Sequence, residues 1–206
     1  MALGTYIAIT AALHFLTPKR ASIRPHWLVP ALEIALLGAL IAASPTDIVR
    51  RARWLRPIAI TLIASLTVTA VVSDGILISD LITGAEVTKA PGSLLASGAL
   101  VWLGTALVFG LLYWELDSGG PLARYQHRRG RPDFAFTQQL SPELAPPGWL
   151  PTYVDYLVLG ITTSTAFSPT DVMPLARWAK LTMALQSLIS LTVIGLVVAR
   201  AVNAFE

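Results

Sequence analysis

The sequence predicts an all-α integral membrane protein with four to five transmembrane helices and a re-entrant helix and loop before the last helix. Of its 206 residues, 54% are hydrophobic and 13% are charged, and the mean hydropathy is +0.65. A soluble domain carries about a quarter charged residues. Three windows without a charged residue, 57–73, 94–114 and 181–199, suit helices that cross a hydrocarbon core of about 30 Å. We therefore expect a multi-pass protein of the cell membrane.

Turn and capping residues divide the chain into segments. Residues 44–47 (SPTD) end an apolar window that only Glu33 interrupts. Residues 91–93 (PGS) open a later window and residues 118–121 (SGGP) close it, as such residues begin or end helices. We expect spans at residues 27–43, 57–82, 93–116 and 175–203, and at residues 2–17 either a short first span or an interfacial helix.

Residue types that other functions need are absent or scattered. The chain has no Cys, which excludes disulfides, thiol catalysis and cysteine-bound metals. Its three His residues are widely spaced, so we expect no metal and no cofactor. No nucleophile–base pair or metal cluster stands out, so we do not expect an enzyme. The net charge is only +3, and the basic residues lie in short clusters, which does not favour nucleic-acid binding.

The segment from Tyr153 to Phe167 is the most informative. Fifteen helical residues cover about 22 Å, which is too short for a comfortable span, and Asp155 lies inside the segment. Hydroxyl side chains crowd its end: Thr162, Thr163, Ser164, Thr165, Ser168 and Thr170. They are costly against lipid but can line a water-filled cavity. The segment predicts a re-entrant helix with an extended return; a helical hairpin packed through Ser and Thr is the alternative.

These residues resemble the pore region of the tetrameric potassium-channel family. That pattern runs Asp-Ala-Leu-Tyr-Phe, a pore helix, Thr-x-Thr-Thr-Val-Gly-Tyr-Gly-Asp, then a proline and the inner helix. Here Asp155 begins the helix, and residues 163–167 (TSTAF) stand in the place of Thr-x-Thr-Thr-Val. Residues 168–170 (SPT) replace Gly-Tyr-Gly, Asp171 follows without a gap, and Pro174 falls at the family's proline.

The chain also resembles uncharacterised bacterial membrane proteins that share the sequences at 113–117 (YWELD) and 166–171 (AFSPTD). This resemblance implies a bacterial inner membrane. Together the two resemblances divide the chain into N-terminal transmembrane helices at residues 1–117, a basic Pro- and Gly-rich loop at 118–151, and a pore-loop-like module at 152–206.

The resemblance implies a filter and a pore-facing inner helix. The filter residues are Thr163, Thr165, Ala166, Phe167, Ser168, Pro169, Thr170 and Asp171, and the inner helix offers a small or polar stripe of Gln186, Ser187, Ser190 and Gly195. A potassium filter needs positive φ at alternate residues, which only Gly adopts cheaply. Pro169 fixes its φ near −65°. We therefore expect a shorter, wider filter lined by hydroxyl groups, and potassium selectivity does not carry over.

Charged residues within or at the ends of the spans are the other candidates. They are Glu33, Asp74 and Arg200, which antiparallel spans place near one membrane face. We expect Arg200 to pair with Glu33 or Asp74, either tying helices together or acting as a gate or proton-sensitive latch. At the opposite face, we expect Glu115 and Asp117 to meet Arg56 or Arg177.

The sidedness of the predicted loop stays open. Residues 44–56 and 117–150 share one face with eight arginines, and the other face has five basic residues. The positive-inside rule places the first face in the cytoplasm, whereas a potassium-channel pore loop enters from outside. Three arrangements remain: a loop entering from outside, an inverted loop entering from the cytoplasm as in the glutamate-receptor relatives, or a segment 151–167 that truly spans.

The sequence thus predicts a pore-loop ion channel, and more specifically a weakly selective monovalent cation channel. One chain supplies one loop and a closed ring needs several, so we expect a homotetramer. Its partners would be further copies of itself, membrane lipid and permeant inorganic ions. Hydroxyl groups both donate and accept, so they do not fix the sign of the ion. An anion channel of the same architecture and a non-conducting assembly or sensor protein are the alternatives.

Overall fold

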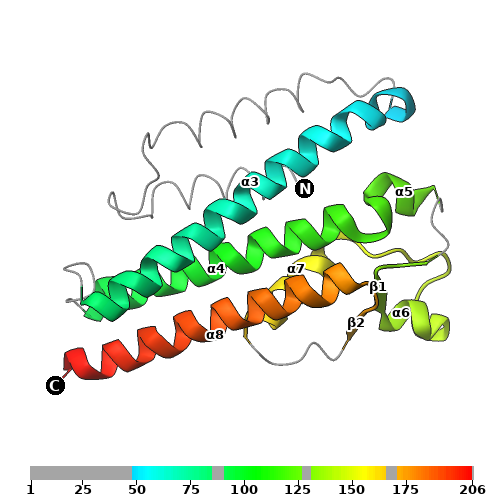
Figure 1. Ribbon diagram of the computed structural model, residues 1–206. Coiled ribbons are helices and arrows are strands. Elements are labelled where there is room, and N and C mark those ends of the chain that lie inside the picture. Colours follow the sequence, from blue (N-terminus) through cyan, green and yellow to red (C-terminus); the bar gives the residue numbers. More distant parts are fainter. Residues whose placement is uncertain (1–47, 85–90, 127–130, 166–170, 206) are drawn as a thin grey trace.

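The structure is a computed structural model that describes residues 48–84, 91–126, 131–165 and 171–205. Three long helices, α3 (Ile48–Thr83), α4 (Pro91–Leu116) and α8 (Arg177–Phe205), lie alongside one another (Figure 1). Between α4 and α8 come, in chain order, η3 (Asp117–Gly119), α5 (Pro121–Tyr125), β1 (Phe134–Phe136), α6 (Thr137–Leu140), η4 (Pro142–Leu144), α7 (Tyr153–Ser164) and β2 (Val172–Pro174).

The three long helices contain stretches that are long and apolar enough to cross a membrane. These stretches are Ala59–Thr83, Leu94–Gly119 and Arg177–Asn203. They coincide closely with the spans predicted at 57–82, 93–116 and 175–203. The described part of the chain is therefore mostly helical, as in a multi-pass membrane protein. The segments predicted at 2–17 and 27–43 lie outside the described residues.

Helix α3 is longer than predicted. It begins at Ile48 and continues through Pro57, where we expected it to start. The basic residues before Pro57 lower the local hydropathy, so the apolar window begins later than the helix itself. Pro57 has no amide hydrogen to bond to the carbonyl four residues back, so one helical hydrogen bond is missing there. The helix thus extends beyond its apolar stretch.

The polar connection between α4 and α7 is structured, and it carries a strand. β1 pairs with β2 in an antiparallel ribbon, with Phe134 opposite Pro174 and Phe136 opposite Val172. The all-α prediction is therefore corrected by one two-stranded ribbon. Strands of three residues are too short to show the alternating pattern by which strands are predicted.

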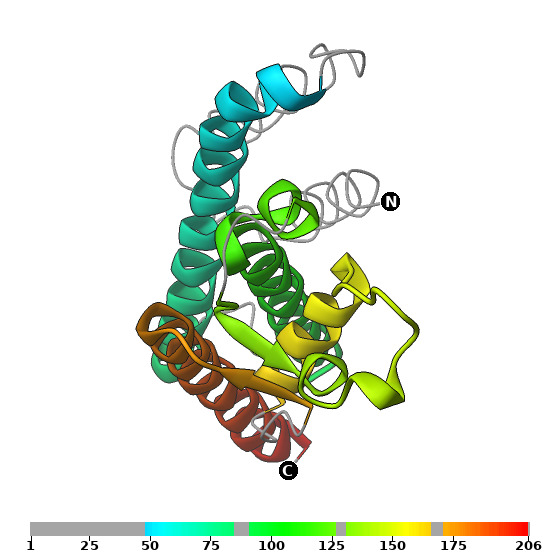
Figure 2. The ribbon, with the colours of Figure 1, turned by 90° about the vertical axis from the view of Figure 1, so that its right-hand side faces the viewer.

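Aromatic side chains fill the core where the ribbon meets the long helices. Tyr113 of α4, Phe134 of β1 and Tyr156 of α7 are fully buried. Phe134 packs edge-on against Tyr156 and against Trp178 of α8, with ring centroids 6.4 and 5.6 Å apart. The ribbon lies across the ends of α4, α7 and α8, so these rings join all four elements (Figure 2).

Helix α7 packs on α4 through glycines. A Cβ atom at Gly160 would lie 2.4 Å from the carbonyl oxygen of Ala106 and 3.0 Å from the amide nitrogen of Gly110. A Cβ atom at Gly110 would lie 3.1 Å from the carbonyl oxygen of Tyr156. Small residues let membrane helices approach this closely. The backbones of the two helices therefore touch at this crossing.

We predict that Gly160→Ala destabilises the protein, because the added methyl group would overlap backbone atoms of α4. Overpacking of this kind costs about 1–3 kcal/mol. Gly75→Ala is the matched control, since no atom of the other described segments lies within 4 Å of a Cβ at Gly75 in α3. Alanine is also the better helix former, by about 1 kcal/mol. Thermal unfolding followed by circular dichroism should show a lower midpoint for Gly160→Ala alone, and equal midpoints would contradict the close crossing.

Candidate functional site

The candidate site is built around the short helix α7. Asp155 fixes its first turn: the Oδ2 atom accepts hydrogen bonds from the backbone nitrogen of Thr152 at 2.7 Å and from Thr152 Oγ1 at 2.8 Å. A carboxylate in this position satisfies an amide that the helix itself leaves without a partner. The helix begins at Tyr153, as predicted, and ends at Ser164, before the predicted end at Phe167.

The last four carbonyl groups of α7 all accept hydrogen bonds. They belong to Ile161, Thr162, Thr163 and Ser164. The first two accept from the backbone nitrogen and Oγ1 of Thr165, at 3.1 and 2.7 Å. The third accepts from Ser187 Oγ at 3.1 Å and the fourth from Trp102 Nε1 at 3.0 Å. The last carbonyl groups of a helix need donors from outside its regular hydrogen bonds. For Thr163 and Ser164, side chains of α8 and α4 supply them and so hold the end of α7.

A second set of hydrogen bonds comes from Gln186 of α8, which is fully buried. Its Oε1 atom accepts from the Tyr113 hydroxyl at 2.5 Å. Its Nε2 atom donates to the carbonyl oxygen of Gly160 at 2.8 Å and to Ser164 Oγ at 2.7 Å. One side chain therefore links α4, α7 and α8, and removing it would leave several buried polar groups without partners.

These contacts place the end of α7 near the middle of the long helices. At a rise of 1.5 Å per residue, Gln186 is about 14 Å from the start of α8, and Trp102 is about 21 Å from the end of α4. In contrast, β2 lies beside β1, just before α8 begins. The chain therefore leaves the ribbon end in α7, reaches the middle of the bundle at Ser164, and is back at the ribbon end at Val172.

Of the predicted filter, the structure describes Thr163, Thr165 and Asp171. Thr163 is buried, and its Oγ1 atom has no hydrogen-bond partner in the described part of the chain. Asp171 is exposed, and its carbonyl oxygen accepts from the nitrogen and Oγ1 of Thr137, both at 3.0 Å. Ala166, Phe167, Ser168, Pro169 and Thr170 lie outside the described residues. The two ends of the predicted filter therefore lie at different depths.

The predicted inner-helix residues do not share one face of α8. Gln186 and Ser190 are buried, Ser187 is half-buried and Gly195 is exposed. We expected one stripe facing a pore, but the amide of Gln186 faces α4 and α7, where it has three partners. These partners come from elements far apart in sequence, so no local sequence pattern predicts them.

Asp117, at the end of α4, forms a buried polar junction. Its Oδ1 atom accepts from Ser118 Oγ and from the backbone nitrogen of Asp133, both at 2.9 Å. Its Oδ2 atom accepts from the Tyr156 hydroxyl. The carboxylate thus ties α4 to the chain before β1 and to α7. The sequence predicted a charged partner for Asp117, but it did not predict the contacts with Tyr156 and with the chain before β1.

Arg124 of α5 completes the junction. Its Nη1 atom lies 4.0 Å from Asp117 Oδ2 and donates to the carbonyl oxygens of Trp114 and Asp117, both at 2.8 Å. The guanidinium lies over the ring of Tyr156, 5.0 Å from its centre. Burial, and then the negative charge of Asp117, raise the pKa of Tyr156 well above its ordinary value. The phenol therefore keeps its proton and donates.

The structure gives charged residues at this face other partners than those predicted. Asp117 meets Arg124 rather than Arg56 or Arg177. Arg56 instead lies beside Gly120, as does Glu115: a Cβ at Gly120 would lie 3.5 Å from Glu115 Oε1 and 3.8 Å from Arg56 Nε. Both side chains therefore approach the same glycine, and a direct ion pair of Arg56 with Glu115 stays a prediction.

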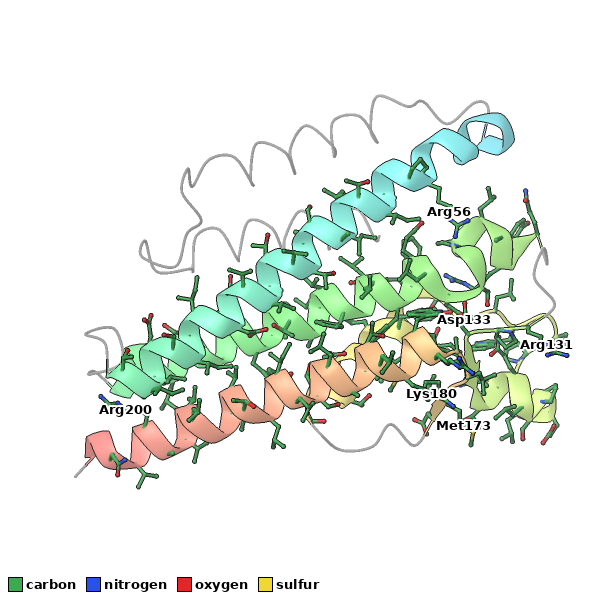
Figure 3. All side chains as sticks on the ribbon, viewed as in Figure 1. Arg56, Arg131, Asp133, Met173, Lys180 and Arg200 are labelled. Atoms are coloured by element: carbon green, nitrogen blue, oxygen red, sulfur yellow. The ribbon has the colours of Figure 1, made fainter. Side chains whose placement is uncertain are left out.

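The structure places Asp74 and Arg200 apart. Asp74 Oδ2 accepts from Thr105 Oγ1 of α4 at 2.8 Å. Arg200 lies beside Gly84, at the end of the bundle opposite Arg56 and Lys180 (Figure 3). Ten residues separate Asp74 from Gly84, about 15 Å along a helix. A pair of Arg200 with Glu33 stays a prediction, because Glu33 lies outside the described residues.

No family model, no curated protein and no solved structure matches the chain. Among the described residues, no group of three or more His, Asp or Glu side chains is arranged to hold a metal ion. What the arrangement offers instead is a short helix with its C-terminus held inside an apolar bundle, and a polar junction that fixes its other end.

We predict that Tyr156→Phe destabilises the protein and that Tyr153→Phe does not. The Tyr156 hydroxyl donates to the buried Asp117 carboxylate, whereas the Tyr153 hydroxyl has no hydrogen-bond partner in the described ranges. Loss of one partner from a buried polar group costs about 1–3 kcal/mol. Thermal unfolding midpoints of the two variants in detergent measure the difference. Equal midpoints for the two variants would mean that the hydrogen bond from the Tyr156 hydroxyl to Asp117 adds no stability.

Proposed function

We propose that the chain is the subunit of a pore-loop ion channel, a homotetramer in which α8 lies innermost and residues 162–171 surround the axis. The path of the chain carries the proposal: α7 runs to the middle of the bundle, and the chain has returned to the ribbon end at β2 before the long helix α8 begins. Such a path is that of a re-entrant loop. Irregular backbone at this depth is tolerated where it is buried in protein or lines a water-filled cavity.

The exposed side of α8 is consistent with a central position. Large apolar side chains are exposed along its whole length; they include Leu181, Leu188, Leu191, Val198 and Val202. The small residue Gly195 is exposed among them. One chain supplies one re-entrant segment, and a closed pore needs several around an axis. Neighbouring copies of the same chain would cover part of this side, and lipid the rest.

Electrostatics at the end of α7 favours cations. The negative end of the α7 helix dipole points to the middle of the bundle, although donors from Thr165, Ser187 and Trp102 offset part of it. Asp171 adds a carboxylate at the ribbon end of the segment. Arg177 and Lys180 are exposed at the same end of α8 and favour anions, which keeps an anion channel as the alternative. The helix end and Asp171 lie closer to the proposed axis, so we favour monovalent cations.

The sequence of the loop favours weak selectivity. Ser168, Pro169 and Thr170 replace the three residues whose backbone carbonyls coordinate potassium in the family that the segment resembles. Without glycine, successive carbonyl groups do not all turn towards one axis. The proposed filter is therefore short and lined mainly by hydroxyl groups.

A non-conducting assembly or sensor protein is the second candidate, and one observation favours it. The four end carbonyls of α7 and the amide of Gln186 all find partners within a single chain. The short helix is therefore satisfied without neighbouring copies. Particle symmetry separates the two candidates, because a fourfold particle favours the channel and a monomer or dimer favours the second candidate.

We predict that the purified protein in a planar bilayer conducts ions, with a reversal potential in a KCl gradient that approaches the potassium equilibrium value. Under bi-ionic conditions the permeability ratio of potassium to sodium should stay below about 50, since a larger ratio needs more than about 2.4 kcal/mol of discrimination, at about 1.4 per tenfold. A ratio above that value would contradict the hydroxyl-lined filter. A reversal potential at the chloride equilibrium value would overturn the cation assignment, and fourfold particles without conductance would overturn the channel.

We predict that Asp171→Asn lowers cation conductance and leaves assembly intact, because it removes a charge and keeps the side-chain shape. Glu143→Gln is the matched control: Glu143 is also exposed at the ribbon end, but it precedes α7 rather than following the loop. Single-channel conductance and size-exclusion profiles give the two readouts. Equal conductance in both variants would mean that Asp171 does not lie at the pore mouth.

A further inference from the structure

Two buried polar atoms in the long helices have no hydrogen-bond partner among the described residues. They are Oδ1 of Asp74 in α3 and Oγ of Ser190 in α8, and both residues are 1% exposed. Ser190 is unusual on its own helix, because Thr182 and Thr192 each donate to the carbonyl oxygen four residues back. Asp74 uses only its other oxygen, which accepts from Thr105. A buried polar atom without a partner is costly and needs an explanation.

The contacts between α3 and α8 place Asp74 and Ser190 at one level. Leu81 of α3 and Val197 of α8 are buried in one cluster near the end of the bundle. The two helices run in the same direction (Figure 1). Asp74 is seven residues before Leu81, and Ser190 is seven residues before Val197. Equal steps along parallel helices bring the two side chains to the same depth.

The contact between α4 and α8 places Thr105 at the same depth in the bundle as Asp74 and Ser190. Gly98 of α4 packs against Val197 of α8, and these helices run in opposite directions. Thr105 is seven residues after Gly98, and Ser190 is seven residues before Val197. The hydrogen bond from Thr105 to Asp74 closes the set, so all three helices contribute one polar side chain at this depth.

The same faces of α3 and α8 meet in an apolar cluster one turn away. Leu77 of α3 and Val193 of α8 are buried together in it. Asp74 and Ser190 each precede those residues by three positions, which puts them on the same helix faces. Asp74 and Ser190 therefore lie in the seam between α3 and α8, the line along which the two helices face each other, one turn beyond the cluster.

No basic side chain is near this level on the three helices. On α3 the nearest charged residue is Asp80, about 9 Å along the helix, and it is acidic. On α4 no residue from Leu94 to Trp114 is charged. On α8 the nearest charges are Lys180 and Arg200, each about 15 Å from Ser190. Among the described helices, the Asp74 carboxylate therefore has no cationic partner at this depth. A buried carboxylate in that position is costly, and it takes up a positive ion or a proton.

We propose that Asp74, Thr105 and Ser190 form a proton-binding site at the middle of the bundle. Proton uptake removes the charge of Asp74, and rotation of the side chains then lets Oδ1 donate to Ser190 Oγ, a hydrogen bond that this structure does not contain. A sodium ion needs more ligands than the two carboxylate oxygens and two hydroxyls that the site offers. Protonation makes the seam between α3 and α8 neutral and hydrogen-bonded, and deprotonation leaves a charge between the helices. The site therefore links the packing of α8 to proton uptake.

The test is infrared spectroscopy of the full-length protein in lipid, titrated with pH. We expect a carbonyl-stretch band of a protonated carboxylic acid that disappears at high pH, is lost in Asp74→Asn, and persists in the control Asp80→Asn. Asp74→Asn keeps a donor for Ser190 and should retain the helical circular dichroism spectrum. Ser190→Ala should move the band to higher wavenumber, because the acid loses its acceptor. This second variant keeps Asp74 and gives a readout whether or not Asp74→Asn folds.

The results that would overturn the proposal are equally specific. A band that persists in folded Asp74→Asn would belong to another acid. If Ser190→Ala does not change the wavenumber of the band, Ser190 is not part of the site. A band that appears when sodium is replaced by choline would mean that the site holds a metal cation in place of the proton. The oligomeric state and ion conductance do not enter the test, so it stands apart from the proposed channel function.

Discussion

A helix that ends inside an apolar bundle must find donors for its last four carbonyl groups, and the arrangement of this protein depends on how α7 meets that requirement. The donors come from Thr165 at its own end, Trp102 of α4 and Ser187 of α8. Trp102 and Ser187 each lie at one depth on their own helices, so these two donors fix where α7 stops. The glycine crossing at Gly160 then fixes how closely α7 approaches α4. Because α7 stops partway, the chain must turn back before α8 begins.

The other end of α7 is fixed by charge rather than by packing alone. Asp117 is buried with Arg124 and Tyr156, and their hydrogen bonds hold α4, α5 and α7 around one carboxylate. Breaking such a buried set by removing one member costs more than the set itself contributes, since a charge is then left without compensation. The ribbon covers the junction through Phe134 and its aromatic neighbours. The short helix is thus anchored at both ends, and its ribbon end also positions the start of α8.

The long helices could be predicted from the sequence because hydropathy over twenty residues is a strong signal. The start of α7 was predictable too, since Asp155 lies where a capping carboxylate is needed. The role of Gln186 was not, because its partners lie on α4 and α7 and no local spacing reports them. The pairing of Asp117 with Arg124 needed the path of the loop between them, which composition does not give. The β-ribbon was not predicted for a different reason: strands of three residues are too short to show a periodic pattern.

The central claim is that the chain enters the bundle in α7 and returns to the same membrane face before α8. The absence of cysteine from the chain permits a direct test with single cysteine substitutions. Leu144→Cys and Leu175→Cys change exposed residues before α7 and after β2, and Thr83→Cys marks the opposite end of the bundle. Labelling with a membrane-impermeant maleimide, from each side in turn, should modify positions 144 and 175 from one side and position 83 from the other. Labelling of positions 144 and 175 from opposite sides would show that residues 145–174 cross the membrane, and would contradict the account.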